Sequence, residues 1–247
     1  MIVNTRKAKF INIVVASIIL VIIGCGETDP EGEAVPKDVF DGESRVLATN
    51  PMIAHWADAV TGTRATVESI LPYSVDPHAY SPGAKDVAQI TKSEYIFAIG
   101  LMYEEKWLTE ILDNNPGIRL VNLGDFVSPI EFEGHEDSHG HGHSDDDEHS
   151  EGREVQYDPH FWFDPQRVSV AVGKIADVMS EIDPDGAYYY RKNAEAYKVV
   201  LDKLNETIVG KIAEIPQPKR KIISEHESLG YLGERYGIDI VGAVVPK

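Results

Sequence analysis

The chain of 247 residues contains a single cysteine, Cys25, so no disulfide can form within it. Its fold must therefore be held by a buried apolar core rather than by covalent links. Cations are also few, because 23 Lys and Arg stand against 41 Asp and Glu, which gives a formal net charge of −18. Such an acidic surface repels polyanions, so the composition argues against a nucleic-acid partner and against direct contact with anionic lipids.

Apolar runs long enough to span a bilayer comfortably are lacking as well. The longest run lies at residues 10–23 and follows three cations between residues 6 and 9. A positive segment before a short apolar run is typical of a secretory signal. The run ends in Ile22-Ile23-Gly24-Cys25, which resembles a bacterial lipobox. Residues 1–25 are therefore predicted to be a lipoprotein signal peptide with Cys25 as the lipidated residue. A plain signal peptide with an incidental cysteine is the alternative.

Residues 26–44 are acidic, rich in glycine and proline, and poor in apolar side chains. Such a segment cannot bury enough apolar surface to fold, so it is predicted to be a flexible tether. Together with a lipidated Cys25, this tether would place the rest of the chain outside the cytoplasm. We expect an extracytoplasmic protein, either lipid-anchored to the outer face of the cytoplasmic membrane or periplasmic.

From residue 45 onward, short runs of β-branched residues alternate with helical patterns. Strands are predicted at Val46–Thr49, Thr66–Ile70, Tyr95–Ile99 and Arg119–Leu123. Helices are predicted to begin at Asn50-Pro51 and Ser81-Pro82, and to cover 103–114 and 165–182. This alternation indicates an α/β lobe over 45–182 with a parallel sheet. Ligands of such sheets gather beyond the carboxyl ends of the strands.

A much longer helical pattern covers 183–215, with one apolar stripe along about 45 Å at ~1.5 Å per residue. A single helix of this length without heptad charge pairs predicts a linker between two lobes. A second α/β lobe begins at 216, with strands at Lys221–Ser224 and Ile238–Val245 around a helix at 228–236. One strand–helix–strand unit is too small for a lobe, so this lobe, 216–247, is expected to be truncated.

The tripeptide Asp-Pro-His occurs twice, ending at His78 and at His160, and each copy is followed two residues later by an aromatic side chain, Tyr80 or Trp162. Proline restricts its own backbone and that of the preceding residue, so each histidine should lie on a stiff turn. Imidazole is the commonest protein ligand for metal ions. The repeat therefore indicates metal binding, with the two aromatic rings as candidate walls of the site.

An acidic, histidine-rich tract at 133–151 precedes the second tripeptide. Its glycine, serine and acidic content cannot form a core, so the tract is predicted to be a disordered loop. It is a candidate for auxiliary metal binding, and a merely solvated acidic loop is the alternative. Its histidines are His135, His139, His141, His143 and His149.

Four blocks of the sequence resemble, in order and spacing, the signature blocks of one family: 72–82, 100–108, 158–165 and 226–237. This is the family of zinc- and manganese-type solute-binding proteins of ABC importers, many of which are surface lipoproteins. The resemblance implies a two-lobed α/β fold of the periplasmic-binding-protein type, with one long helix joining the lobes and a metal ion between them. It implies His78, His160 and His226 as metal ligands, with a fourth, acidic ligand beyond the last residue.

The same resemblance implies which metal the protein binds and what function that binding serves. His226 stands where manganese-type members tend to carry glutamate, and the histidine-rich insert is typical of the zinc branch, so Zn²⁺ is favoured over Mn²⁺ or Fe²⁺. Asp76 and Asp158 are candidates to orient the ligands, whereas His55 is expected to be an ordinary surface residue. The implied function is capture of Zn²⁺ by a monomer and its delivery to the membrane permease of an ABC importer, without enzymatic activity.

Two alternatives from other classes stay open. One is a zinc-dependent hydrolase that uses the same three histidines, with Glu225 or Glu227 as the base. No His-Glu-x-x-His or comparable catalytic motif supports it. The other is a metal-buffering surface adhesin that works without a transporter.

Overall fold

The computed structural model describes residues 46–73, 75, 77, 79–132 and 155–245, all within one unit of the chain, Pro36–Lys247. The signal peptide with Cys25, the tether, Asp76, His78 and the tract histidines lie outside the described residues. The predictions made for them are therefore not tested by the fold. Along the part that is described, no helix is both long and apolar enough to cross a membrane.

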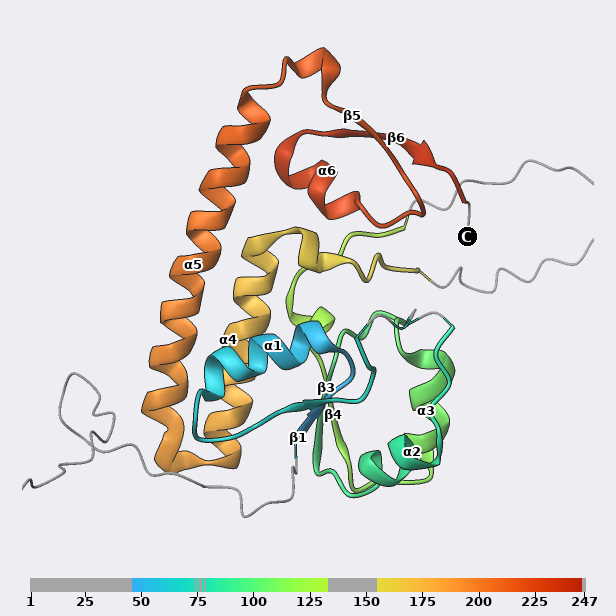
Figure 1. Ribbon diagram of the computed structural model, residues 1–247, viewed down its shortest axis with the longest axis vertical. Helices are drawn as coiled ribbons and strands as arrows, with labels where there is room; N and C mark the ends of the chain where they lie inside the picture. The colour runs from blue at the N-terminus through green and yellow to red at the C-terminus, as the bar shows by residue number, and fades with distance from the viewer. Residues whose placement is uncertain (1–45, 74, 76, 78, 133–154, 246–247) are drawn as a thin grey trace, which may run out of the picture. The chain divides into compact units, whose positions relative to one another are not determined.

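The central element is a parallel four-stranded sheet in the order β2-β1-β3-β4 (Figure 1). Its strands are β1 (Val46–Ala48), β2 (Glu68–Ser69), β3 (Tyr95–Ala98) and β4 (Arg119–Asn122). The predicted α/β class and parallel strands are confirmed. Strand β2 is shorter than predicted, although Ile70 and Leu71 still donate backbone hydrogen bonds to Ala48 and Thr49 beyond its end. Strands β1 and β3 lie at the centre of the sheet. Between them the order in which the chain adds strands reverses.

The helices begin where their capping residues dictate. Asn50 Oδ1 accepts hydrogen bonds from two backbone N–H groups at the start of α1, and Asp164 does so once for α4. The predicted start of the next helix at Ser81-Pro82 is wrong, because α2 begins at Ala84. There Asp86 accepts a hydrogen bond from the backbone N–H of Gly83, so this later capping interaction fixes the first turn. The helices of this lobe are α1 (Pro51–Thr61), α2 (Ala84–Ile90), α3 (Glu105–Asp113) and α4 (Pro165–Ile182).

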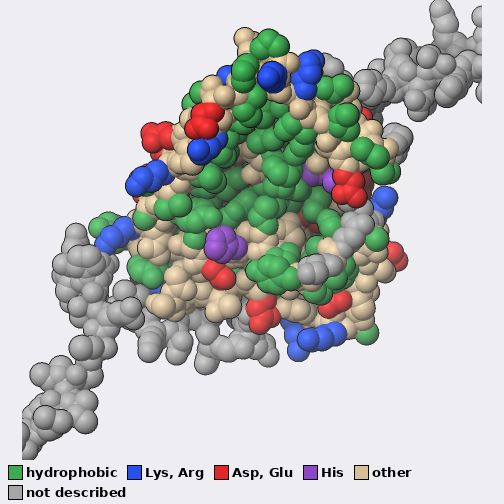
Figure 2. All heavy atoms as spheres, turned by 45° about the horizontal axis from the view of Figure 1, so that its top comes forward, with side chains coloured by type: hydrophobic (Ala, Val, Ile, Leu, Met, Phe, Trp, Pro, Cys, Tyr) green, Lys and Arg blue, Asp and Glu red, His purple; other side chains and the backbone are tan. Residues whose placement is uncertain are grey.

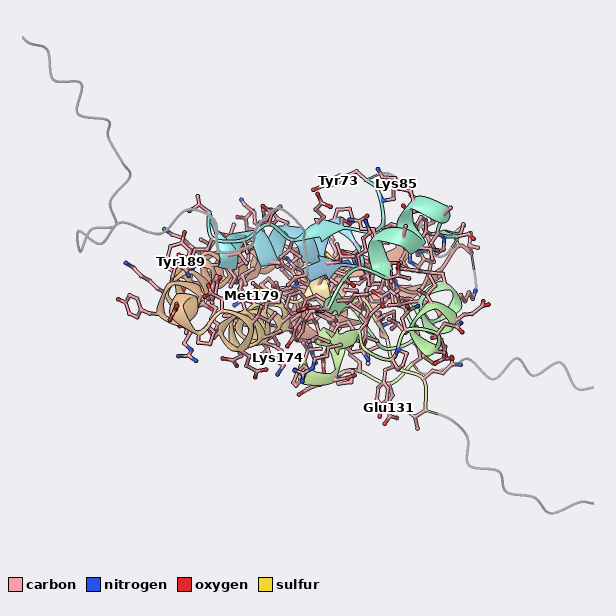
Figure 3. All side chains as sticks on the ribbon, turned by 90° about the horizontal axis from the view of Figure 1, so that it is seen from below. Tyr73, Lys85, Glu131, Lys174, Met179 and Tyr189 are labelled. Atoms are coloured by element: carbon pink, nitrogen blue, oxygen red, sulfur yellow. The ribbon has the colours of Figure 1, made fainter. Side chains whose placement is uncertain are left out.

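The helices cover both faces of the sheet (Figure 3). Successive side chains of a strand point to opposite faces, so Val46 and Ala48 pack with α1 and α4 while Leu47 packs with α2 and α3. The larger cluster also contains Phe97, Ile99 and the apolar side of α4. Both faces of the central strands β1 and β3 are thus buried, as is usual in parallel sheets covered by helices.

A 27-residue helix, α5 (Ala187–Ala213), follows a 3₁₀ turn, η3 (Pro184–Gly186), and packs along α4 (Figure 1). The predicted apolar stripe is only partly buried in the described structure. Tyr190, Ala194 and Leu201 are covered, whereas Leu204 is about half exposed. The reason is length, because α4 has 18 residues and leaves the later turns of α5 without this neighbour. Figure 2 shows hydrophobic side chains gathered on one face of the molecule.

A second, two-stranded parallel sheet follows α5, formed by β5 (Lys221–Ser224) and β6 (Asp239–Ala243) with α6 (Gly230–Tyr236) between them. The helix ends at Gly237, whose φ of 64° is the left-handed conformation that glycine adopts without strain. This is the strand–helix–strand unit that the sequence predicted after residue 216.

A buried ion pair ties the α1–β2 connection to the α4–α5 corner. Arg64 donates two hydrogen bonds to Asp183 Oδ2, at 2.8 and 3.1 Å, and the hydroxyl of Tyr190 donates a third at 2.7 Å. Both charged side chains are 5% exposed. The backbone N–H of Gly186 donates to Asp183 Oδ1, so each carboxylate oxygen has a partner.

Candidate metal site

His160 lies in a turn that its own tripeptide builds. It precedes a 3₁₀ turn, η2 (Phe161–Phe163), and is 2% exposed. Asp158 Oδ1 accepts a hydrogen bond from the backbone N–H of His160 at 2.9 Å and lies 2.7 Å from its Nδ1. An ionised carboxylate can only accept, so Nδ1 carries the proton and the ring nitrogen available to a metal ion is Nε2. The sequence proposal that Asp158 orients this histidine has the geometry it requires.

His226 lies between β5 and α6, and its Nε2 atom is 3.4 Å from Nε2 of His160. The two ring centroids are 5.3 Å apart. Two of the three ligands implied by the sequence are thus brought together from positions 66 residues apart. The third, His78, belongs to the undescribed residues, and among the described ones no group of three His, Cys, Asp or Glu side chains is arranged to hold an ion.

Aromatic rings surround His160, as the sequence suggested, but not all of them are the ones it named. Trp162 contacts the imidazole edge-on at 5.0 Å between centroids. Tyr103 contacts both His160 and Trp162, at 6.5 and 5.6 Å. Tyr80 instead packs edge-on against Trp107 in the smaller core, so its candidacy as a wall is not supported. Apolar rings near an imidazole keep water away and strengthen electrostatic interactions there.

A buried carboxylate that sequence reasoning missed holds the segment carrying Tyr103. Glu104 is 4% exposed and accepts hydrogen bonds from the hydroxyl of Thr49 at 2.6 Å and from the backbone N–H groups of Ile99 and Gly100 at 2.9 and 3.0 Å. Burial raises the pKa of its carboxyl group to about 7, against these hydrogen bonds, which lower it. No local signal marks this residue, because a glutamate before a helix is usually exposed.

The backbone that Glu104 holds is strained. Gly100, Leu101 and Met102 have φ values of 74°, 54° and 67°, and the left-handed region costs a non-glycine residue about 1–3 kcal/mol. Two such non-glycine residues in a row, Leu101 and Met102, persist only where other contacts fix them. The hydrogen bonds that Ile99 and Gly100 donate to Glu104 fix this segment. The carboxylate of Glu104, at the end of the central strands, therefore holds in place the segment that carries Tyr103, one of the aromatic residues beside His160.

His55 is exposed on α1, and its ring lies 6.2 Å from that of Tyr197. It is an ordinary surface residue, as expected.

The family described as ZnuA, zinc-uptake complex component A, periplasmic, matches residues 46–247. The chain belongs to the ZnuA family. Among relatives, it is 30% identical over 238 residues to the manganese-binding lipoprotein MntA of Halalkalibacterium halodurans, covering 96% of this chain and 70% of that protein. It is 28% identical to the manganese ABC transporter substrate-binding lipoprotein PsaA of Streptococcus pneumoniae, over 82% of this chain and 62% of that protein.

Solved structures agree on the fold. A crystal structure of ZnuA aligns with a TM-score of 0.66 and 27% identity, covering 83% of this chain and 70% of that one. The periplasmic zinc-binding protein TroA from Treponema pallidum aligns with a TM-score of 0.67 and 23% identity, covering 80% of this chain and 65% of that one. The chain therefore spans about 62–70% of the length of these relatives.

These matches confirm the predicted family and the predicted α/β class. They leave the metal unresolved within the ZnuA family, since relatives are named for manganese or for iron while the family is named for zinc.

Proposed function

We propose that this ZnuA-family chain is the extracytoplasmic metal-binding component of an ABC importer and that His78, His160 and His226 bind its cargo, Zn²⁺ in preference to Mn²⁺ or Fe²⁺. The observation that carries the proposal is the pair of Nε2 atoms 3.4 Å apart, with one imidazole oriented by a buried aspartate. Two ligands of a tetrahedral zinc ion, with bonds of ~2.0–2.1 Å, are separated by about 3.3 Å. The described half of the site therefore has the spacing of one edge of a zinc tetrahedron.

The donor set supports zinc over manganese. Imidazole nitrogen suits borderline ions such as Zn²⁺, whereas Mn²⁺ prefers carboxylate, carbonyl and water oxygens. A glutamate in place of His226 would shift this preference towards oxygen-binding ions.

A competition titration tests the metal and its stoichiometry. We expect one tight Zn²⁺ site that Mn²⁺ does not displace at equal concentration, together with several weak Zn²⁺ sites. The weak sites are assigned to the tract at 133–151, because a segment without a core must be ordered by each ion it binds. Deleting 133–151 should remove the weak sites and leave the tight one, and loss of the tight site on deletion would show that the tract itself is the receptor. Tighter binding of Mn²⁺ than of Zn²⁺ would contradict the metal assignment.

The protein is proposed to be a monomer anchored by a lipid on Cys25 and to pass its ion to a membrane permease. Because a single acyl chain binds membranes only marginally, the anchor requires the diacylglyceryl pair that lipoproteins carry. In cell fractionation, the wild-type protein should sediment with membranes and Cys25→Ala should not. Equal partitioning of both would reject lipidation at this residue.

The alternatives have weaker support. The family is that of a zinc-uptake component, which does not favour a hydrolase or an adhesin that acts without a transporter. Glu225, one candidate base, is exposed to solvent.

A further inference from the structure

Tyr231 of α6 makes a contact that sequence reasoning did not assign. Its side chain is fully buried in the larger core cluster. The hydroxyl group donates a hydrogen bond of 2.6 Å to the backbone carbonyl of Asp158 and accepts one of 3.2 Å from the backbone N–H of Ile130. One phenol thus touches two chain segments that lie far from it in the sequence.

The two segments form a short antiparallel pairing into which the hydroxyl is inserted. Glu131 and Tyr157 form an antiparallel bridge, and the backbone N–H of Asp158 donates to Ile130 at 2.9 Å. Facing residues of an antiparallel pair ordinarily exchange two hydrogen bonds. Between Ile130 and Asp158 the second bond runs through Tyr231, whose hydroxyl is both acceptor and donor. The end of this pairing is therefore closed by a side chain of α6.

Asp158 is where this contact meets the metal site. Its carboxylate holds the Nδ1 atom of His160, and its carbonyl holds Tyr231. Gly230, the first residue of α6, also lies close to Asp158, since a Cβ atom at Gly230 would be 2.8 Å from Asp158 Oδ2. His226 comes four residues before Gly230. Both sides of Asp158 thus face the helix that directly follows the second histidine.

We propose that Tyr231 is a positioning residue of the metal site: its hydroxyl fixes Asp158 and His160 against α6, so that the two imidazoles are held at metal-binding distance before the ion arrives. This rests on the proposed function. The benefit is preorganisation, because a site whose halves are already aligned loses less freedom on binding.

Further contacts support the same role. Arg167 of α4 lies over the Tyr231 ring at 4.6 Å and pairs with Glu234 of α6 at 2.8 Å. Arg167 also donates to the backbone carbonyls of Val127 and Ser128, just before Ile130. Burial raises the pKa of the Tyr231 phenol to about 12, so its hydroxyl stays protonated and able to donate under physiological conditions.

Removing the hydroxyl alone tests the proposal, and the same helix offers a matched control. Tyr236 is also buried on α6, but its hydroxyl lies 3.2 Å from Asn205 Oδ1 on α5, away from Asp158. By chelator competition, Tyr231→Phe should weaken zinc binding by about 10- to 100-fold, the usual effect of losing a group that orients a ligand. Tyr236→Phe should change it by less than about threefold.

Two further readouts separate positioning from general stability. In the metal-free protein, ¹⁵N shifts of the His160 ring should report loss of the fixed Nδ1–H tautomer in Tyr231→Phe but not in Tyr236→Phe. Gly230→Ala should weaken zinc binding in the same direction while keeping the hydroxyl, because its new methyl group must displace the Asp158 carboxylate.

The outcomes are distinct. Equal zinc affinity in wild type and Tyr231→Phe, or equal losses in Tyr231→Phe and Tyr236→Phe, would overturn the positioning role while the proposed function stands. Wild-type protein that binds no zinc would instead reject the proposed function, and unchanged His160 shifts would then reject the positioning role as well.

Discussion

Replacing His160 by alanine is expected to lower the zinc affinity of this chain by at least about a hundredfold. Structural zinc sites bind with roughly 10–16 kcal/mol from four ligands, so the loss of one ligand removes about 3 kcal/mol, and each 1.4 kcal/mol is a factor of ten. Water can take the vacated position, but it does not restore the lost nitrogen donor. The measurement is a competition titration against a chelator of known affinity, at neutral pH.

His226→Ala should have an effect of the same order, because its Nε2 atom is the partner in the 3.4 Å pair. His55→Ala is the matched control, since that ring is exposed on α1. Thermal unfolding without metal should show that all three variants fold. If His55→Ala weakened zinc binding as much as the other two, or if none did, the assignment of the site would be wrong.

The second large effect is expected on stability rather than on binding. Arg64→Met should lower the free energy of unfolding by about 3–5 kcal/mol, because it leaves the buried carboxylate of Asp183 without its cation. The hydrogen bonds from Tyr190 and Gly186 remain but carry no charge. For a domain of this size the melting temperature should fall by roughly 10 °C.

Arg119→Met is the control for this variant. Arg119 is exposed on β4, where its guanidinium group donates a hydrogen bond to the hydroxyl of Tyr95 and lies over the Tyr95 ring. Its substitution should change stability by about 0.5 kcal/mol or less. A drop in melting temperature of the same size in both variants would show that the buried pair contributes nothing special.

The Arg64 effect should also depend on pH, with a definite sign. Burial alone would raise the pKa of Asp183, but hydrogen bonds from Tyr190 and Arg64 and the charge of Arg64 outweigh it and lower the pKa. A carboxyl group with a lowered folded-state pKa contributes stability above its unfolded-state pKa, about 3.9, and loses it as pH falls through the folded-state value. The gap between wild type and Arg64→Met should therefore be full at neutral pH and shrink in acid.

The sequence predicted best what depends on neighbouring residues. The cap at Asn50, the start of a helix at Pro165 and the parallel direction of the strands follow from the local pattern of residues, and the structure has them. The pairing of His160 with His226 was predicted through the family resemblance, since nothing local to either residue indicates the other. The two histidines were linked only because their sequence blocks follow the order and spacing found in the family.

What the sequence did not predict depends on contacts across the fold. Glu104 and Tyr231 matter through hydrogen bonds to distant backbone groups, and neither residue type signals such a role. The early end of burial along α5 depends on the length of α4. The start of α2 depends instead on a local capping bond, which the backbone N–H of Gly83 donates to Asp86. Tyr80 followed the expected spacing but packs in the other core, because spacing along the chain does not decide which face a side chain occupies.

The distance in sequence between the two imidazoles has a consequence for folding kinetics. Their contact spans 66 residues, and the paired helices α4 and α5 occupy most of that span. Closing a loop of this length carries an entropy cost that contacts within the helical hairpin can offset only once it has formed. Contacts of high sequence separation also slow folding. The imidazole pair is therefore expected to form late, after α4 and α5 have packed, so a partly folded chain lacks the paired His160–His226 site.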